Sequence, residues 1–290
     1  MTTEAVQFGL RTVDGESLVA AGVPVPAPAI IPRPFNLVRS SRIPSDNTNR
    51  WQEGFSYLPE GIGSAGISDA GCAGDYEEMV NTDPAVADWT PYALTAEFKC
   101  STFGAADYED RVKNLLDSMT PKLLEWEFWG GPLTTAAGLD NEFLMQIDPA
   151  IATVDVSTDK FAIATAVGAL ENYLANCGVG GRGMIHVPPF LIPVMHLVGL
   201  HKDGNLLLTD QDTIVVPGAG YAQYAVDSAG VQKPTLDIYA TGITDARIGD
   251  IMVEDTDTFD RATNTVIRRA QRIACVSWDK LCGAKVTIKP

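Results

Sequence analysis

The C-terminal segment, residues 264–290, constrains the fold most, because it combines a long strand, a short turn and a closing strand. Apolar and polar side chains alternate along the closing strand, residues 284–289, with the period of a sheet that buries one face. Its apolar members are Ala284, Val286 and Ile288. We expect residues 265–276 to form the partner strand of this two-stranded ribbon.

The expected partner strand is apolar at both ends and cationic in the middle, where it carries Arg268, Arg269 and Arg272. A strand that buries one face in its own subunit rarely has this pattern, so we expect these arginines to contact another subunit. The chain has a net charge of -16, and the segment Glu60–Glu97 holds eight acids and no base. That segment of an adjacent copy, which includes Glu77 and Glu78, is the first candidate partner. Alternatively, the arginines face solvent.

The N-terminal part, residues 1–50, favours an extended arm, because prolines interrupt residues 23–34 and restrict the backbone to extended conformations. Its basic side chains are Arg33, Arg39, Arg42 and Arg50. Complementary charge between subunits explains these arginines and the acids after them. Two solvated loops explain them equally well.

The pattern of residues 51–100 is that of one long loop, an excursion that runs out from the rest of the subunit and back to it. Aromatic residues stand at its beginning and at its end. These are Trp51, Phe55, Tyr57 and Trp89. We expect a returning strand from Trp89 to Phe98. An excursion with few apolar residues must pack on something else, so we take these aromatic side chains as candidate subunit contacts.

An α+β fold is indicated by the remaining pattern. Apolar residues at helical spacing predict a helix from Asp107, which Pro121 should kink or divide and Gly130 should end. A second helix is predicted over residues 159–177. Strands are predicted at 184–187, 205–209, 213–217, 236–240 and 247–253.

The cysteines do not form a zinc-binding pattern, and most should be buried thiols. They are Cys72, Cys100, Cys177, Cys275 and Cys282. Two pairings stay open as minor alternatives: Cys275 with Cys282 across the terminal turn, and Cys72 with Cys100 on the limbs of the excursion.

No constellation of residues predicts catalysis, a cofactor or a metal. The histidines are His186, His196 and His201, and nothing in the sequence places them on one face. The excess of acids argues against a free-standing nucleic-acid binder. No membrane-spanning segment or secretion signal is evident.

Five segments in order resemble the major capsid proteins of tailed bacteriophages, which have the Hong Kong 97-type fold, and in particular those of phages that infect actinobacteria. They are residues 50–61, 100–104, 127–130, 177–186 and 264–272. Pro121 departs from the family's pattern, as does the lack of an obvious N-terminal scaffolding segment.

The resemblance implies an organisation into parts of known role. Residues 1–50 would be an N-terminal arm and 51–104 the extended loop. Residues 105–188 would be the long spine helix and the first part of the peripheral domain, 189–241 the axial domain, and 242–290 the second part of the peripheral domain.

The same resemblance implies a function without enzymatic activity. The protein would assemble with itself, as hexamers and pentamers, into an icosahedral head shell around double-stranded DNA. It would form in the host bacterial cytoplasm with a separate scaffolding protein, a portal and, as an optional component, a decoration protein. An encapsulin-type nanocompartment shell is the alternative, and a hydrolase or metal enzyme is a more distant one.

Overall fold

The computed structural model describes residues 31, 33–44, 49–57, 87–101, 108–148, 150–155, 161–177, 182–196, 199–254, 258–260, 265–279 and 282–289. The chain divides into two compact units, Met1–Ile31 and Pro32–Pro290. Every helix and strand described below belongs to the second unit.

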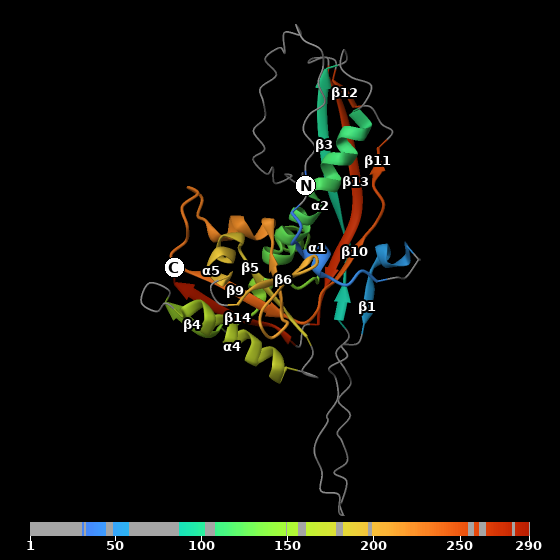
Figure 1. Cartoon of the computed structure of the whole chain (residues 1–290). Helices are drawn as coiled ribbons and strands as arrows, with labels where there is room; N and C mark the ends of the chain where they lie inside the picture. Colours follow the sequence, from blue (N-terminus) through green and yellow to red (C-terminus); the bar gives the residue numbers. More distant parts are fainter. Residues whose placement is uncertain are drawn as a thin grey trace, which may run out of the picture. The chain divides into compact units, whose positions relative to one another are not determined.

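The first sheet, the long sheet, is built around β13 (Thr265–Ser277). One edge of β13 pairs with β3 (Tyr92–Ser101), and the two strands run side by side in Figure 1. The other edge pairs with β10 (Asp245–Ile248), β11 (Met252–Val253) and β12 (Thr258–Asp260). All of these pairings are antiparallel, and the predicted returning strand is confirmed as β3.

The second sheet, the seven-stranded sheet, is mixed. Its order is β4 (Ala150–Asp155), β14 (Ala284–Lys289), β9 (Leu236–Thr241), β5 (Met184–Val187), β8 (Ile214–Pro217), β7 (Leu206–Leu208) and β6 (His201–Asp203). The pairs β4–β14 and β5–β8 are parallel, and the others are antiparallel. Strands predicted near 184–187, 205–209, 213–217 and 236–240 are therefore confirmed.

The expected terminal ribbon is wrong in its pairing. Both strands exist, and β14 buries alternate residues as its sequence predicts. However, both edges of β13 are already occupied by strands of the long sheet. β14 instead adds to the seven-stranded sheet, between β4 and β9.

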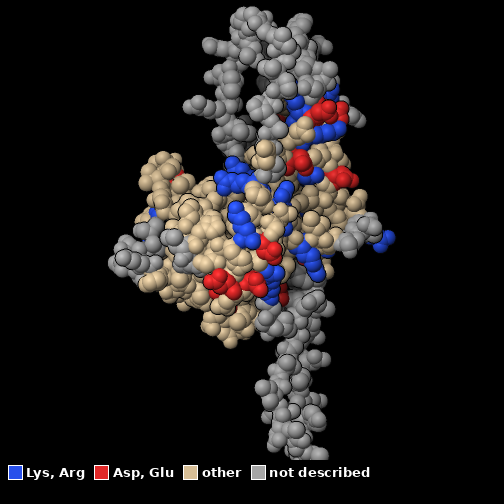
Figure 2. Space-filling view, viewed as in Figure 1, with Lys and Arg blue, Asp and Glu red and all other residues tan. Residues whose placement is uncertain are grey.

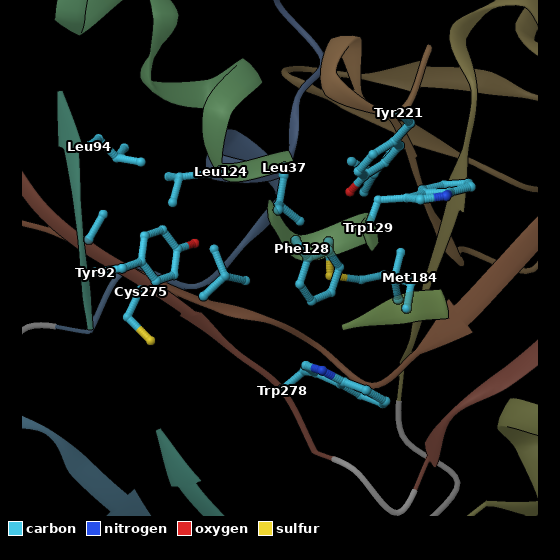
Figure 3. Close-up of a cluster of buried hydrophobic side chains, with 14 of the residues drawn as sticks. Leu37, Tyr92, Leu94, Leu124, Phe128, Trp129, Met184, Tyr221, Cys275 and Trp278 are labelled. Carbon is cyan, nitrogen blue, oxygen red and sulfur yellow. The ribbon is translucent and has the colours of Figure 1, made fainter. Parts of the chain in front are cut away.

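Helix α2 (Tyr108–Gly130) lies between the two sheets and contributes to one core with both. Figure 3 shows Phe128 of this helix between Tyr92 on β3 and Met184 on β5, and Trp129 beside Tyr221. Pro121 lies inside the helix without dividing it. Gly131 follows with a φ of 56°, a left-handed conformation that glycine adopts at little cost. α3 (Pro132–Ala137) begins there.

Helix α4 (Ala162–Asn176) covers the opposite face of the seven-stranded sheet, together with η3 (Pro189–Leu191) and α5 (Ile192–Met195). Its predicted apolar stripe is buried, and consists of Ile163, Ala166, Val167, Leu170 and Leu174. Because both faces of the sheet are covered, every residue of β5 and β8 is buried. This pattern is typical of a central strand.

A disulfide joins Cys177, at the C-terminal end of α4, to Cys282, just before β14. Cys275 is a buried free thiol, and its pKa is raised to about 12 by burial. The alternative pairing of Cys275 with Cys282 is therefore wrong, because β13 and β14 lie in different sheets. The alternative pairing of Cys72 with Cys100 falls outside the described residues, since Cys72 and the Cys100 side chain are not among them.

Shorter elements complete the described part of the second unit. They are α1 (Leu37–Ser40), η1 (Asn49–Glu53), β1 (Phe55–Tyr57), β2 (Ala87–Trp89), η2 (Leu144–Gln146) and η5 (Ala219–Ala225). β1 and β2 pair antiparallel, so the chain leaves and returns at the same place. No helix of the described residues is long and apolar enough to cross a membrane.

The seven-stranded sheet takes strands from all three of the ranges 105–188, 189–241 and 242–290. The boundaries at residues 188 and 241, which the resemblance implied between the peripheral and axial domains, therefore divide the strands of one sheet. The last range is also shared between sheets, since β10 to β13 belong to the long sheet and β14 does not.

Candidate assembly surface

The N-terminal segment, defined as residues 33–44, is docked along the subunit at two points. Asn36 caps α1 by accepting a 3.0 Å hydrogen bond from the Arg39 backbone, and Leu37 is fully buried. Beyond the helix, the backbone N–H of Arg42 donates to the Thr244 carbonyl at 2.9 Å. The Arg42 guanidinium makes two hydrogen bonds to Asp245, at 2.7 and 2.8 Å, and this fork geometry fixes its orientation.

Arg269 pairs with an acid of its own chain. It stands opposite Glu97 in the register of β13 and β3, and its Nε donates to Glu97 Oε1 at 2.7 Å. Glu254 approaches the same guanidinium at 3.6 Å. Glu97 lies in the acidic segment expected to supply a partner from an adjacent copy, but the contact forms within one chain.

Arg272 connects the long sheet to α2. Its Nη1 donates to Asp117 at 3.1 Å and to the Thr120 hydroxyl at 3.2 Å, and its Nε donates to the Gly249 carbonyl at 3.1 Å. Only 13% of its side chain is exposed. Arg268 lies on the same face of the sheet, since it stands opposite Phe98 in the register as Arg272 stands opposite Leu94. Arg269 and Arg272 thus have partners inside the subunit, and the charge of Arg268 acts on Glu109 of α2.

The aromatic residues of the excursion divide into buried and partly buried groups. Trp51 and Trp89 belong to the subunit's own core, with 8% and 1% exposure. Their expected role as subunit contacts is corrected by this burial, because side chains closed off within one subunit cannot reach another. Phe55 is half-buried, and the Arg247 guanidinium lies 4.6 Å from its ring centroid. The side chains of Tyr57, Glu77 and Glu78 are outside the described part of the chain.

The long sheet has one face against α2 and an opposite, outer face. Ala93, Thr95 and Glu97 alternate with the α2-facing residues of β3 and are exposed. Arg269 and Met252 add an exposed guanidinium and an apolar side chain. Figure 2 shows basic and acidic side chains together over the middle of the molecule, whereas the surface over α4 and β4 is largely uncharged. Arg33, Arg39 and Arg50 are also exposed.

The buried histidine, His186, is held by hydrogen bonds at both of its ring nitrogens. His186 contacts Tyr221 Oη at 3.1 Å through Nδ1 and Thr241 Oγ1 at 2.9 Å through Nε2. Burial lowers the pKa of His186 to about 3, so its ring is neutral at physiological pH. His196 bonds the Leu200 carbonyl instead. No group of three or more His, Cys, Asp and Glu side chains in the described ranges could hold a metal.

The family models and the curated proteins gave no match to this chain. Solved structures did. The capsid of an empty GTA particle matches with a TM-score of 0.55 and 14% identity, over 94% of this chain and 95% of that one. A structure of Mycobacterium phage Ogopogo matches with a TM-score of 0.54 and 11% identity, over 92% and 96%. A structure of Microbacterium phage Oxtober96 matches with a TM-score of 0.52 and 12% identity, over 93% of this chain and 96% of that one.

Each of these similarities extends over more than nine-tenths of the chain. The chain therefore has the Hong Kong 97-type α+β fold of tailed-phage capsid proteins, as its sequence predicted. At this level of identity the comparison defines the fold.

Proposed function

We propose that this protein is the major capsid protein of a tailed bacteriophage and assembles with itself into an icosahedral shell that encloses double-stranded DNA. The observation that carries the proposal is the match to capsid structures over more than nine-tenths of the chain. The capsids of the GTA particles were computed with C5 symmetry. A fold that forms closed shells elsewhere favours the same use here.

Two features of the subunit support a structural role. The outer face of the long sheet presents paired charges and Met252 to its surroundings, which suits contacts with further copies. The chain's net charge of -16 would keep packaged DNA from adhering to the protein. Many weak contacts repeated around a closed shell sum to a stable assembly.

Within this proposal, the subunit contacts involve the exposed or undescribed members of the predicted set. They are Arg33, Arg39, Arg42, Arg50, Arg269, Tyr57, Glu77 and Glu78. The protein would act in the virion capsid after assembly in the host cytoplasm, with a separate scaffolding protein, a portal and, as an optional component, a decoration protein. No enzymatic step is required of the subunit.

The proposal is tested by expressing the full chain with and without the neighbouring phage genes. Sedimentation velocity should show capsomers or closed particles, and particles from infected cells should contain DNA that resists nuclease. Particles that contain a protein cargo and no DNA would favour the nanocompartment alternative. A compact monomer under all of these conditions would overturn the proposal.

A further inference from the structure

Glu125 on α2 is a completely buried carboxyl group that joins three separate segments of the chain. Its Oε1 accepts a 3.0 Å hydrogen bond from the backbone N–H of Leu37, at the start of α1. Its Oε2 accepts a 2.9 Å hydrogen bond from the backbone N–H of Gly220 in η5. One side chain therefore holds both the N-terminal segment and η5 against α2.

The contact with η5 depends on close backbone approach. A Cβ at Gly220 would lie 2.4 Å from the Lys122 carbonyl oxygen and 2.5 Å from the Trp126 nitrogen, so only glycine fits. Nearby, Tyr224 donates from its hydroxyl to the Trp126 carbonyl at 3.0 Å. η5 is thus fixed against α2 independently of Glu125. The N-terminal segment has its second attachment further along, at Thr244 and Asp245.

The charged and titratable groups around this carboxyl are few. Arg33, in the N-terminal segment, acts on it through its charge, and Tyr221, in η5, has its own pKa raised first by burial and then by Glu125. On α2 the nearest ionisable neighbours in sequence are Lys122 and Glu127. α1 also carries Arg39, which is exposed.

We propose that Glu125 makes docking of the N-terminal segment proton-linked, so that the segment binds more tightly when this carboxyl is protonated. Nothing in this inference requires shell assembly, since it concerns contacts within one subunit. Undocking of Leu37 would admit water to a carboxyl that α1 and η5 enclose. A carboxyl in water ionises more readily than a buried one, so the two states bind protons differently.

The direction of the linkage follows from the balance of burial and hydrogen bonding. Burial raises the pKa of Glu125 from 4.5 to about 7, although the backbone N–H groups of Gly220, Leu37 and Ala219 and the charge of Arg33 lower it. The docked state therefore keeps its proton to a higher pH than the undocked state. Docking is strongest at low pH and weakens by up to about tenfold per pH unit towards neutrality, then becomes constant.

Hydrogen exchange of the full chain, followed by mass spectrometry of peptides covering α1, tests this linkage. We expect the protection of residues 37–42, corrected for the intrinsic exchange rate, to fall as the pH rises from about 5 to about 8. The Glu125→Gln variant cannot ionise at this position, so its protection should not change over the same range. Glu127→Gln is the matched control. Glu127 is also buried in α2, but it accepts hydrogen bonds from Leu133 and Thr134 instead.

A second variant, Arg33→Ala, tests the linkage even if Glu125→Gln does not fold stably. Arg33→Ala removes the charge that lowers the pKa of Glu125, so the pH at which protection becomes constant should move upward. An unchanged pH profile in both Glu125→Gln and Arg33→Ala overturns the proposal. So does protection that rises with pH in the natural chain, because the backbone N–H groups would then favour docking of the ionised form.

Discussion

The two sheets of the subunit differ in how much of their surface is buried and in what stabilises them. The seven-stranded sheet is covered on both faces, its central strands β5 and β8 are wholly buried, and a disulfide ties α4 to the start of β14. The long sheet buries the face against α2, while its outer face is buried near Cys275 and Ser277 but exposed at Ala93, Thr95 and Glu97. Its outer face carries ion pairs such as Glu97–Arg269 and an exposed Met252.

This difference indicates which region supports folding and which is free for contacts outside the subunit. A sheet buried on both sides has little left to offer a partner, so its sequence is constrained by packing. An antiparallel sheet with one solvated face keeps polar groups available. We therefore expect substitutions to separate the two regions, with stability affected in the first and assembly in the second.

The largest expected effect comes from opening a cavity in the seven-stranded sheet. Ile185 on β5 is fully buried. Ile185→Ala should lower the free energy of unfolding by about 2–5 kcal/mol, since it removes buried methyl groups and leaves a void. Denaturant unfolding followed by circular dichroism measures this.

The matched control lies on the outer face of the long sheet. Thr95 is exposed on β3, and Thr95→Ala should change stability by about 0.5 kcal/mol or less. If both substitutions cost the same, the distinction between the two sheets fails.

A smaller effect is expected from the disulfide of the seven-stranded region. Cys177 and Cys282 are separated by 105 residues, so the bond removes a long loop from the unfolded chain. Reduction should lower the free energy of unfolding by about 2–4 kcal/mol. Thermal unfolding with and without reductant measures the loss.

The double variant Cys177→Ser and Cys282→Ser should lose its response to reductant. A persistent response would place the stabilising bond elsewhere in the chain.

The smallest effect on stability should come from the outer face. Arg269→Ala should cost about 0.2–1 kcal/mol, because solvent screens an exposed ion pair. A double-mutant cycle with Glu97→Ala isolates the pair's own contribution.

Charge reversal makes the same position informative about assembly. Arg269→Glu places like charges opposite each other and should slightly destabilise the subunit. If the outer face also contacts other copies, sedimentation should show that this variant stays folded but forms fewer particles. Unimpaired particles from Arg269→Glu would contradict an interface role for this guanidinium.

Local patterns in the sequence predicted much of the fold. The alternation in β14 and the apolar stripe of α4 were evident because each reflects burial on one side of a regular element. The pairing of β13 was not evident. It is decided by β3, whose ten-residue register with β13 joins segments far apart in the chain.

The candidate site was predictable only in part, for the same reason. The sequence singled out Arg269 and Arg272 as unusual but could not show that Glu97 and Asp117 of the same chain lie beside them. It missed Glu125 altogether. A lone acid among Leu123, Leu124 and Trp126 was the available signal, because a carboxyl on an apolar face needs hydrogen-bond donors.

Electron microscopy of the purified full-length protein tests the central claim most directly. The account predicts closed, uniform shells or ring-shaped capsomers, in which the long sheet's outer face lies against neighbouring copies and the seven-stranded sheet keeps its own core. A homogeneous population of isolated subunits, unchanged when the phage's other head proteins are supplied, would contradict it.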